Sequence, residues 1–259
     1  MTLAALQSLE RFLLPNVCVA CERPIEPTRA DRLVCGLCRA RLTGLVGGCE
    51  RCSQPLPPVG PCRFCVEWPV VLSSVRSAVW LSDEAREIVH HLKYEGYRAL
   101  ASEIAEIIVR CLPQPPRGVL VPIPLGKRRL RSRGYNQAEE IARALADQWN
   151  LPLAGGLLRR TRDTRTQTAL APEEREENVK GAFASPSMVP QRPSAPLAMV
   201  TDGDVRRCRR SGAIILIDDV LTTGATLAAA ARSLEQAGWK QVGAVTFARA
   251  LPFAVRTGV

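Results

Sequence analysis

The chain has 259 residues, of which 46% are hydrophobic and 23% are charged. This hydrophobic content supports a packed core and excludes a generally disordered chain, while the length fits one ordinary domain plus a small additional module. The formal net charge of +10 indicates an anionic partner, such as nucleic acid, a phosphorylated metabolite or a membrane surface, or else a solvated basic surface.

The N-terminal stretch MTLAALQSLERFLLPN has apolar residues at helical spacing, at Leu3, Leu6, Leu9, Phe12 and Leu13. It predicts a short amphipathic helix that packs on the rest of the protein rather than on a membrane. The stretch lacks the basic region and cleavage site of a signal peptide, and no apolar run reaches the roughly 18 residues of a membrane-spanning helix. We therefore expect a cytoplasmic protein without a transmembrane segment.

Eight of the ten cysteines form four C-x-x-C pairs in the first quarter of the chain. Two residues between thiolates form a tight knuckle, and two knuckles complete a tetrahedral Zn²⁺ site. Without a secretory signal, a reducing cytosol favours metal over disulfides. We therefore predict two structural zinc ions, held by Cys18, Cys21, Cys35, Cys38, Cys49, Cys52, Cys62 and Cys65.

The pairing of the knuckles stays open, because sequential and interleaved sites would use the same thiolates. Gly44, Gly47 and Gly48 predict a flexible break between the two halves and favour sequential sites. Few large aliphatic residues occur here, so the metals would supply most of the folding energy. We predict that residues 1–69 form the amphipathic helix plus a double zinc-ribbon module. Cys111 and Cys208 stand alone and are expected to be packing and loop cysteines.

From about Val70 the composition becomes that of an ordinary globular domain, in which short apolar strands alternate with helices. Two helices are expected within 82–112, with Gly96 between them, another at 135–149, and an alanine-rich one that ends near Gly238. Strands are expected at 118–125, 213–217 and 241–250, and the last helix is expected to begin after the loop 220–226. This alternation predicts an α/β domain with a largely parallel sheet over 70–259. His90 and His91 are expected to be uncommitted helix-surface residues.

Three segments concentrate positive charge, which we expect in loops, where a pyrophosphate site or a nucleic-acid backbone would need it. They contain Lys127, Arg128, Arg129, Arg131 and Arg133; Arg159, Arg160, Arg162 and Arg165; and Arg206, Arg207, Arg209 and Arg210. The candidates for DNA contact are Arg129, Arg131 and Arg133. Aromatic residues make up only 5% of the chain, which excludes an extended stacking platform and leaves Tyr135 as the best single stacking residue.

Two other segments have a structural interpretation. Glu173, Glu174, Glu176 and Glu177 follow Pro172 and suit the first turns of a helix better than a catalytic carboxylate pair. The stretch 185–212 is rich in proline and has no apolar period, so we predict a flexible insertion rather than a domain boundary.

The stretch IILIDDVLTTGATL places two carboxylates after the apolar run that ends at Ile217. In open α/β sheets, ligands bind beyond the carboxyl ends of the strands. The residues from Val220 to Thr226 are expected to form a loop before a helix, where amides, hydroxyls and the helix dipole can hold a phosphate. Paired acids beside such a loop suit a sugar phosphate. The simpler alternative is an acidic strand end followed by a threonine helix cap.

The stretch ILIDDVLTTGAT resembles the phosphoribosyl-pyrophosphate (PRPP) signature of type I phosphoribosyltransferases. Over nearly its whole length, except the proline-rich insertion, the chain resembles the ComF family, whose members join a cysteine-rich zinc module to such a domain. The supporting segments are HHLKYEGYRALA, VPIPLGKRRLRSRGYNQAEEIARALA, LLRRTRDTRTQTALAPEEREENVKGAF and DDVLTTGATLAAAARSLEQAGW.

This resemblance implies a type I phosphoribosyltransferase-like parallel sheet under a small hood. The two acids would bind the ribose hydroxyls of PRPP, and the loop would bind its 5′-phosphate. The implied PRPP-binding residues are Asp218, Asp219, Val220, Leu221, Thr222, Thr223, Gly224, Ala225 and Thr226. The pyrophosphate would face Leu125, Gly126, Lys127 and Arg128. Mg²⁺ would accompany PRPP, held mostly by the substrate.

The resemblance does not identify catalytic residues. Purine-salvage enzymes carry an acidic residue where this chain has Thr222, so the loop is more similar to that of orotate-type enzymes. ComF proteins are associated with uptake of single-stranded DNA in natural competence, which implies single-stranded DNA and competence-machinery proteins as partners. The leading hypothesis is therefore a PRPP-binding protein of the ComF type. The alternatives are a biosynthetic phosphoribosyltransferase with a small-molecule acceptor and a zinc-ribbon adaptor whose α/β domain is a relic.

Overall fold

The computed structural model describes residues 17–25, 32–57, 59–115, 117–163, 178–185 and 213–250. Some of the predictions concern residues outside these ranges: the N-terminal helix, the insertion apart from Ser185, Arg165, Cys208, the arginines within 206–210 and the glutamates within 173–177. In the part of the chain that is described, no helix is long and apolar enough to cross a membrane.

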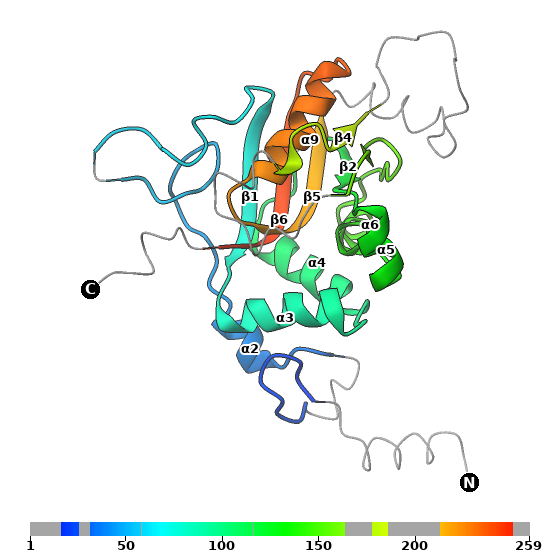
Figure 1. Ribbon diagram of the computed structural model, residues 1–259. Coiled ribbons are helices and arrows are strands. Elements are labelled where there is room, and N and C mark those ends of the chain that lie inside the picture. The colour runs from blue at the N-terminus through cyan, green and yellow to red at the C-terminus, as the bar shows by residue number, and fades with distance from the viewer. Residues whose placement is uncertain are drawn as a thin grey trace.

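Within the described residues, four parallel strands form a central sheet in the order β1-β6-β5-β2 (Figure 1). They are β1 (Leu72–Trp80), β2 (Val119–Pro122), β5 (Ile214–Leu221) and β6 (Val242–Arg249). Successive side chains of a strand point to opposite faces, so Ile215 and Ile217 belong to one hydrophobic cluster and Ile214 and Leu216 to another. The predicted α/β class with a parallel sheet is confirmed.

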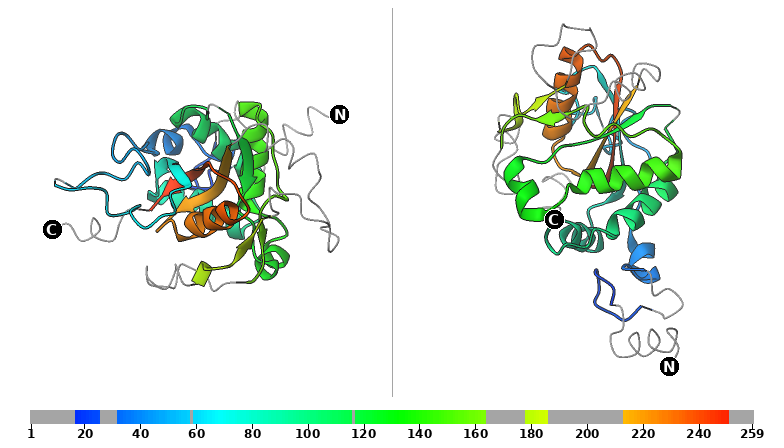
Figure 2. Two further views of the ribbon diagram at one scale, coloured as in Figure 1. Left: turned by 90° about the horizontal axis from the view of Figure 1, so that it is seen from above. Right: turned by 90° about the vertical axis from the view of Figure 1, so that its right-hand side faces the viewer.

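Helices cover both faces of the sheet (Figure 2). On one face α4 (Leu100–Cys111) packs against α6 (Gln137–Trp149), and α3 (Asp83–Tyr94) lies next to α4. The opposite face is covered by α9 (Ala225–Gln236), beside the short antiparallel pair β3 (Arg159–Arg160) and β4 (Phe183–Ala184). This arrangement leaves the carboxyl ends of β2 and β5 next to α3 and the segment that follows β2.

The basic segment after β2 is not the predicted loop. It forms helix α5 (Lys127–Arg133), which starts after Gly126 and ends at Gly134 in the left-handed conformation (φ 78°). Lysine, arginine and leucine are good helix formers, and glycine is the preferred residue at a left-handed helix end. Local propensity therefore outweighs the repulsion between neighbouring cations here.

The two cysteine-rich segments lie at different places on the α/β domain. The first contains α2 (Gly36–Arg41) and lies beyond α3, whereas the segment near residues 45–70, drawn in cyan, lies beside β1 (Figure 1). Arg39 of α2 forms ion pairs of 3.0 Å with Glu103 and with Glu106 of α4. Between the segments, Gly44 forms a β-bridge with Val79, so this glycine is anchored to the sheet and does not act as the predicted flexible break.

Candidate functional site

A cleft of about 350 Å³ opens at the carboxyl ends of β2 and β5, where ligands bind in open parallel sheets. Its walls come from the end of β5 and the following loop, from the chain after β2, and from α3 and α5. Among its charged lining residues, the cations Arg86, Lys93, Arg129, Arg133 and Arg160 outnumber the acids Asp218 and Asp219. The cleft therefore suits a ligand with several negative charges.

From the sequence we expected the strand before the two acids to end at Ile217, but it does not. β5 continues to Leu221, because β6 remains in register beside it as far as the pair Leu221 and Arg249. Asp218 and Asp219 are consequently fixed within the ladder, and only Thr222–Gly224 separate the strand from α9. This short connection holds the acids and the helix start close together.

The two acids differ in their surroundings. Asp219 is buried and forms an ion pair of 2.8 Å with Lys93 of α3. Asp218 accepts a hydrogen bond of 2.9 Å from the Asp219 amide. Its burial and the negative charge of Asp219 raise the pKa of Asp218 to about 7, and the cations of Lys93 and Arg160 offset this increase only in part. A ligand that stabilises the carboxylate would therefore find Asp218 partly protonated at neutral pH.

The start of α9 has the features of a phosphate-binding turn. Gly224 adopts the left-handed conformation (φ 81°) at the N-cap and has no side chain to cap the helix, and the first turn contains no acidic residue. The helix dipole thus favours an anion at this end. The hydroxyl of Thr223 lies 3.4 Å from the Ala225 amide, and Thr222, Gly224 and Thr226 line the cleft.

The predicted pyrophosphate segment, residues 125–128, contributes little to the cleft, whereas Arg129 and Arg133 further along α5 line it. Leu125 lines it, but Gly126, Lys127 and Arg128 are not among its lining residues. Gly126 is buried against Asp163, whose carboxylate lies 3.4 Å from the Arg128 amide, and the side chains of Lys127 and Arg128 are exposed.

The arginines of α5 that were predicted to contact DNA divide between two faces. Arg129 and Arg133 line the cleft, whereas Arg131 is exposed. Arg133 lies over the ring of Tyr94, 4.9 Å from its centroid. The prediction that Tyr135 could stack on a base is wrong, because the residue is only 6% exposed and its hydroxyl donates to the Leu92 carbonyl. Tyr94 is instead 57% exposed at the edge of the cleft.

Three side chains that line the cleft were not identified as site residues from sequence. Lys93 and His90 lie on the cleft side of α3, although the histidine was expected to be an uncommitted surface residue. Arg160, predicted only as part of a basic segment, reaches the cleft from β3 and lies 5.2 Å from the Phe183 ring centroid. Burial and the charge of Arg129 lower the pKa of Arg160 to about 10. The only sequence signal for Lys93 was the segment HHLKYEGYRALA, which resembles ComF proteins.

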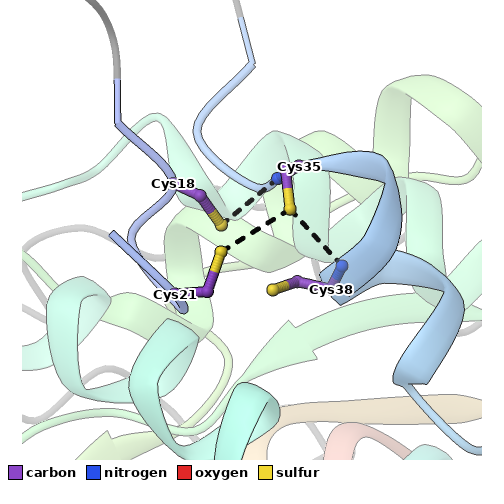
Figure 3. Close-up of side chains that lie close together, drawn as sticks. All are labelled: Cys18, Cys21, Cys35 and Cys38. Atoms are coloured by element: carbon purple, nitrogen blue, oxygen red, sulfur yellow. Dashed lines mark hydrogen bonds between the residues drawn. The ribbon is translucent and has the colours of Figure 1, made fainter. Parts of the chain in front are cut away.

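Eight cysteines form two separate groups of four. Their sulfur atoms lie within 4.8 Å of one another in each group, and the groups are Cys18, Cys21, Cys35, Cys38 and Cys49, Cys52, Cys62, Cys65. Figure 3 shows the first group, in which the side chains converge from two knuckles. Sequential pairing, favoured on sequence grounds, is thus confirmed for the cysteines.

The spacing of the sulfurs fits zinc. The sulfur–sulfur distances are 3.8 Å for Cys21 and Cys35 and 3.7 Å for Cys49 and Cys65. Zn–S bonds of about 2.3 Å in a tetrahedron place sulfurs about 3.8 Å apart, whereas a disulfide needs about 2.05 Å. Burial opposes ionisation of Cys35, but hydrogen bonds from the Cys38 amide and nearby thiols outweigh it and lower the Cys35 pKa to about 7. The donor set is that of a closed structural zinc site.

Comparison with known proteins finds one matching domain family and several relatives with related names. The phosphoribosyl transferase domain family matches residues 130–251. The chain is 27% identical to the DNA utilization protein YhgH of Salmonella typhi, over 87% of this chain and 93% of the relative. It is 29% identical to the competence protein ComFC of Bacillus subtilis, over 81% of each. A third relative, competence protein F of Haemophilus influenzae, is 30% identical over 51% of this chain and 50% of its own.

Two of these relatives carry the competence names that the sequence resemblance led us to expect. YhgH and ComFC match along most of the chain. The domain match covers Asp218, Asp219, the turn before α9 and the part of α5 from residue 130. The tetracysteine groups and the parallel sheet agree with the architecture of such proteins. Over most of its length the chain is therefore similar to ComF-type competence and DNA utilization proteins, and it carries a phosphoribosyl transferase domain.

Proposed function

We propose that the cleft binds PRPP together with Mg²⁺. The observation that carries this proposal is that Asp218, Asp219 and the start of α9 line the same cleft as five cationic side chains. The acids would accept hydrogen bonds from the ribose hydroxyls, and the amides from Thr222 to Thr226 would bind the 5′-phosphate. Mg²⁺ would be held mainly by the pyrophosphate and ribose oxygens of the ligand, because this ion retains few protein contacts in phosphate sites.

The pyrophosphate would lie against Arg129, Arg133 and Arg160 rather than against Lys127 and Arg128. The first three side chains line the cleft, whereas the side chains of the last two are exposed. Guanidinium groups bind phosphates through paired hydrogen bonds. In a transfer reaction they would stabilise the leaving pyrophosphate while the other walls hold the ribose in position.

We further propose that the protein acts with single-stranded DNA during natural competence. Relatives that match most of the chain are named for competence and for DNA utilization. On this chain the exposed cations of α5 lie beside the cleft, and Tyr94 offers an exposed aromatic ring at its edge. Cations that track the backbone and an aromatic ring that stacks on bases are the elements of single-strand binding.

A biosynthetic transferase with a small acceptor is the second candidate. This candidate is favoured by His90 and Tyr94, which line the same cleft as the acids. The centroids of their rings lie 5.1 Å apart. An acceptor held there would be within the same cavity as the ribose. The two candidates are separated by incubating the protein with PRPP, Mg²⁺ and either oligonucleotides or free bases, and by measuring pyrophosphate release.

The two tetracysteine groups are proposed to hold one structural zinc ion each. We expect elemental analysis of the purified protein to give two zinc ions per chain, because both groups have the sulfur spacing of a tetrahedral site. A measured value of one zinc ion or none, in protein purified without chelators, would contradict this prediction.

Replacing both acids, Asp218→Asn and Asp219→Asn, is expected to abolish PRPP binding without unfolding the protein. Each charge-assisted hydrogen bond that is removed should cost about 1.5–3 kcal/mol, while the amides keep the shape of the side chains. Calorimetric titration with PRPP and Mg²⁺ measures the effect, and Arg131→Gln serves as a control because this arginine is exposed and does not line the cleft. An unchanged dissociation constant in the double variant would refute the assignment.

The affinity for PRPP should rise between pH 6 and pH 8. Asp218 has a raised pKa of about 7 in the unliganded fold, so at lower pH a proton must leave before the carboxylate can accept from the ligand. The same linkage makes the unliganded fold less stable as the pH rises from about 4 to about 7, because Asp218 loses its proton in the unfolded chain and largely keeps it in the fold. Asp218→Asn retains only the titration of the ligand's own phosphates, so a pH profile identical in the wild type and this variant would contradict the prediction.

The exposed cations of α5 should bind single-stranded DNA weakly and without sequence preference, because interactions with phosphates carry no base information. Replacing Lys127, Arg128 and Arg131 by glutamine should lower the affinity for all sequences. Each cation–phosphate interaction that the substitutions remove should reduce the log–log slope of affinity against salt by about 0.7. Filter binding at several salt concentrations measures this slope. Unaltered binding by the triple variant, or no binding by the wild type at low salt, would contradict the prediction.

A further inference from the structure

The two tetracysteine groups belong to different hydrophobic cores. Cys18 and Cys38 pack in the cluster that contains the buried side chains of α3 and α4. Cys52 and Cys65 pack in the other cluster, together with Leu221 at the end of β5 and Leu227 of α9. The second group is therefore connected to the phosphate-binding turn through the core, and the first group is not.

Trp68 provides the contact between the second group and this turn. It follows Cys65 closely in the chain, is 7% exposed and packs edge-on against Phe64, with ring centroids 5.4 Å apart. Its indole lies directly against Gly224: a Cβ atom at Gly224 would be only 2.2 Å from Trp68 Cζ2. The left-handed turn that precedes α9 is thus in van der Waals contact with the indole, and the absence of a side chain at Gly224 is required for that contact.

Arg51, which lies inside the first knuckle of the second group, fixes the segment that carries Trp68. Its guanidinium donates to four backbone carbonyls, those of Cys65 (2.9 Å), Trp68 (3.1 Å), Pro69 (2.7 Å) and Leu72 (3.0 Å). The Arg51 carbonyl in turn accepts from the Val75 amide of β1 at 2.8 Å. A knuckle held in shape by metal would therefore hold Trp68 in place, since one side chain joins both knuckles to the start of β1.

Arg249 connects the same group to the end of β5. This fully buried arginine pairs with Leu221 in the sheet register, donates from Nη1 to the Cys52 carbonyl and lies 4.3 Å from the Phe64 ring centroid. Its Nε and Nη2 have no hydrogen-bond partner among the described residues. Zn²⁺ with four thiolates carries a net charge of −2, so a buried cation beside the site lowers the cost of burying that charge.

We propose that the second tetracysteine group positions the phosphate-binding turn of the cleft through Trp68. The first group stabilises only the face of the sheet that α3 and α4 cover. Trp68 is then a positioning residue for the ligand's phosphate. The effect on ligand affinity rests on the proposed PRPP site, but the effect on the turn itself does not, because the contact between Trp68 and Gly224 exists without ligand.

A matched pair of ligand variants tests the proposal in the full chain. Cys49→Ser and Cys21→Ser each remove one half-buried thiolate, from the second and the first group respectively. Each should reduce the zinc content of the protein. Only Cys49→Ser should accelerate amide hydrogen exchange in the peptide that covers 221–228 and weaken PRPP binding, by about tenfold or more if the turn shifts by an ångström.

Trp68→Leu keeps the test decisive if Cys49→Ser fails to fold. It leaves all thiolates in place, so the zinc content should equal that of the wild type while exchange at 221–228 becomes faster and PRPP binding weaker. Wild-type exchange at 221–228 in folded Trp68→Leu protein, or equal acceleration by Cys21→Ser, would overturn the inference. If the wild type itself does not bind PRPP, the proposed function fails, and the exchange measurements still decide whether the second group positions the turn.

Discussion

Two adjacent carboxylates at the end of a buried strand are the constraint on which this cleft depends. Asp218 and Asp219 lie within a sheet ladder that holds them in place, so their mutual repulsion cannot be relieved by movement of the backbone. The structure compensates for one charge directly, through Lys93 at 2.8 Å from Asp219. The other carboxyl remains partly protonated at neutral pH, as its raised pKa shows. A ligand with hydroxyl donors and an accompanying cation would complete this compensation.

The remaining walls of the cleft follow from the same requirement. A polyphosphorylated ligand needs cations, and these come from α3, α5 and β3, which are distant in sequence but adjacent at the carboxyl edge of the sheet. It also needs a turn that presents amides, and α9 supplies one that begins at a glycine in the left-handed conformation. The tetracysteine segments contribute differently: one supports the helices, and the other packs beneath the turn through Trp68.

The parts that could be predicted from sequence are those encoded by local spacing. The C-x-x-C pairs, the parallel α/β alternation and the stretch from Asp218 to Thr226 each have a short-range pattern, and the structure places the cysteines in the expected groups. Local patterns were misleading where the conformation is decided by neighbouring elements. β5 runs past two acids because β6 lies beside it, and Tyr135 is buried because its hydroxyl meets the Leu92 carbonyl. The roles of Lys93 and Trp68 come from tertiary contacts, so no local pattern indicates them; Lys93 was marked only by its place in a segment that resembles ComF proteins.

The most direct measurement of the central claim is a structure of the protein crystallised with PRPP and Mg²⁺. We predict electron density for one PRPP molecule in the cleft, with ribose hydroxyls within hydrogen-bond distance of Asp218 and Asp219 and the 5′-phosphate at the start of α9. The pyrophosphate should contact arginines that line the cleft, Arg129 or Arg160 among them. A PRPP molecule bound elsewhere, or one whose ribose lies away from the two acids, would contradict this assignment.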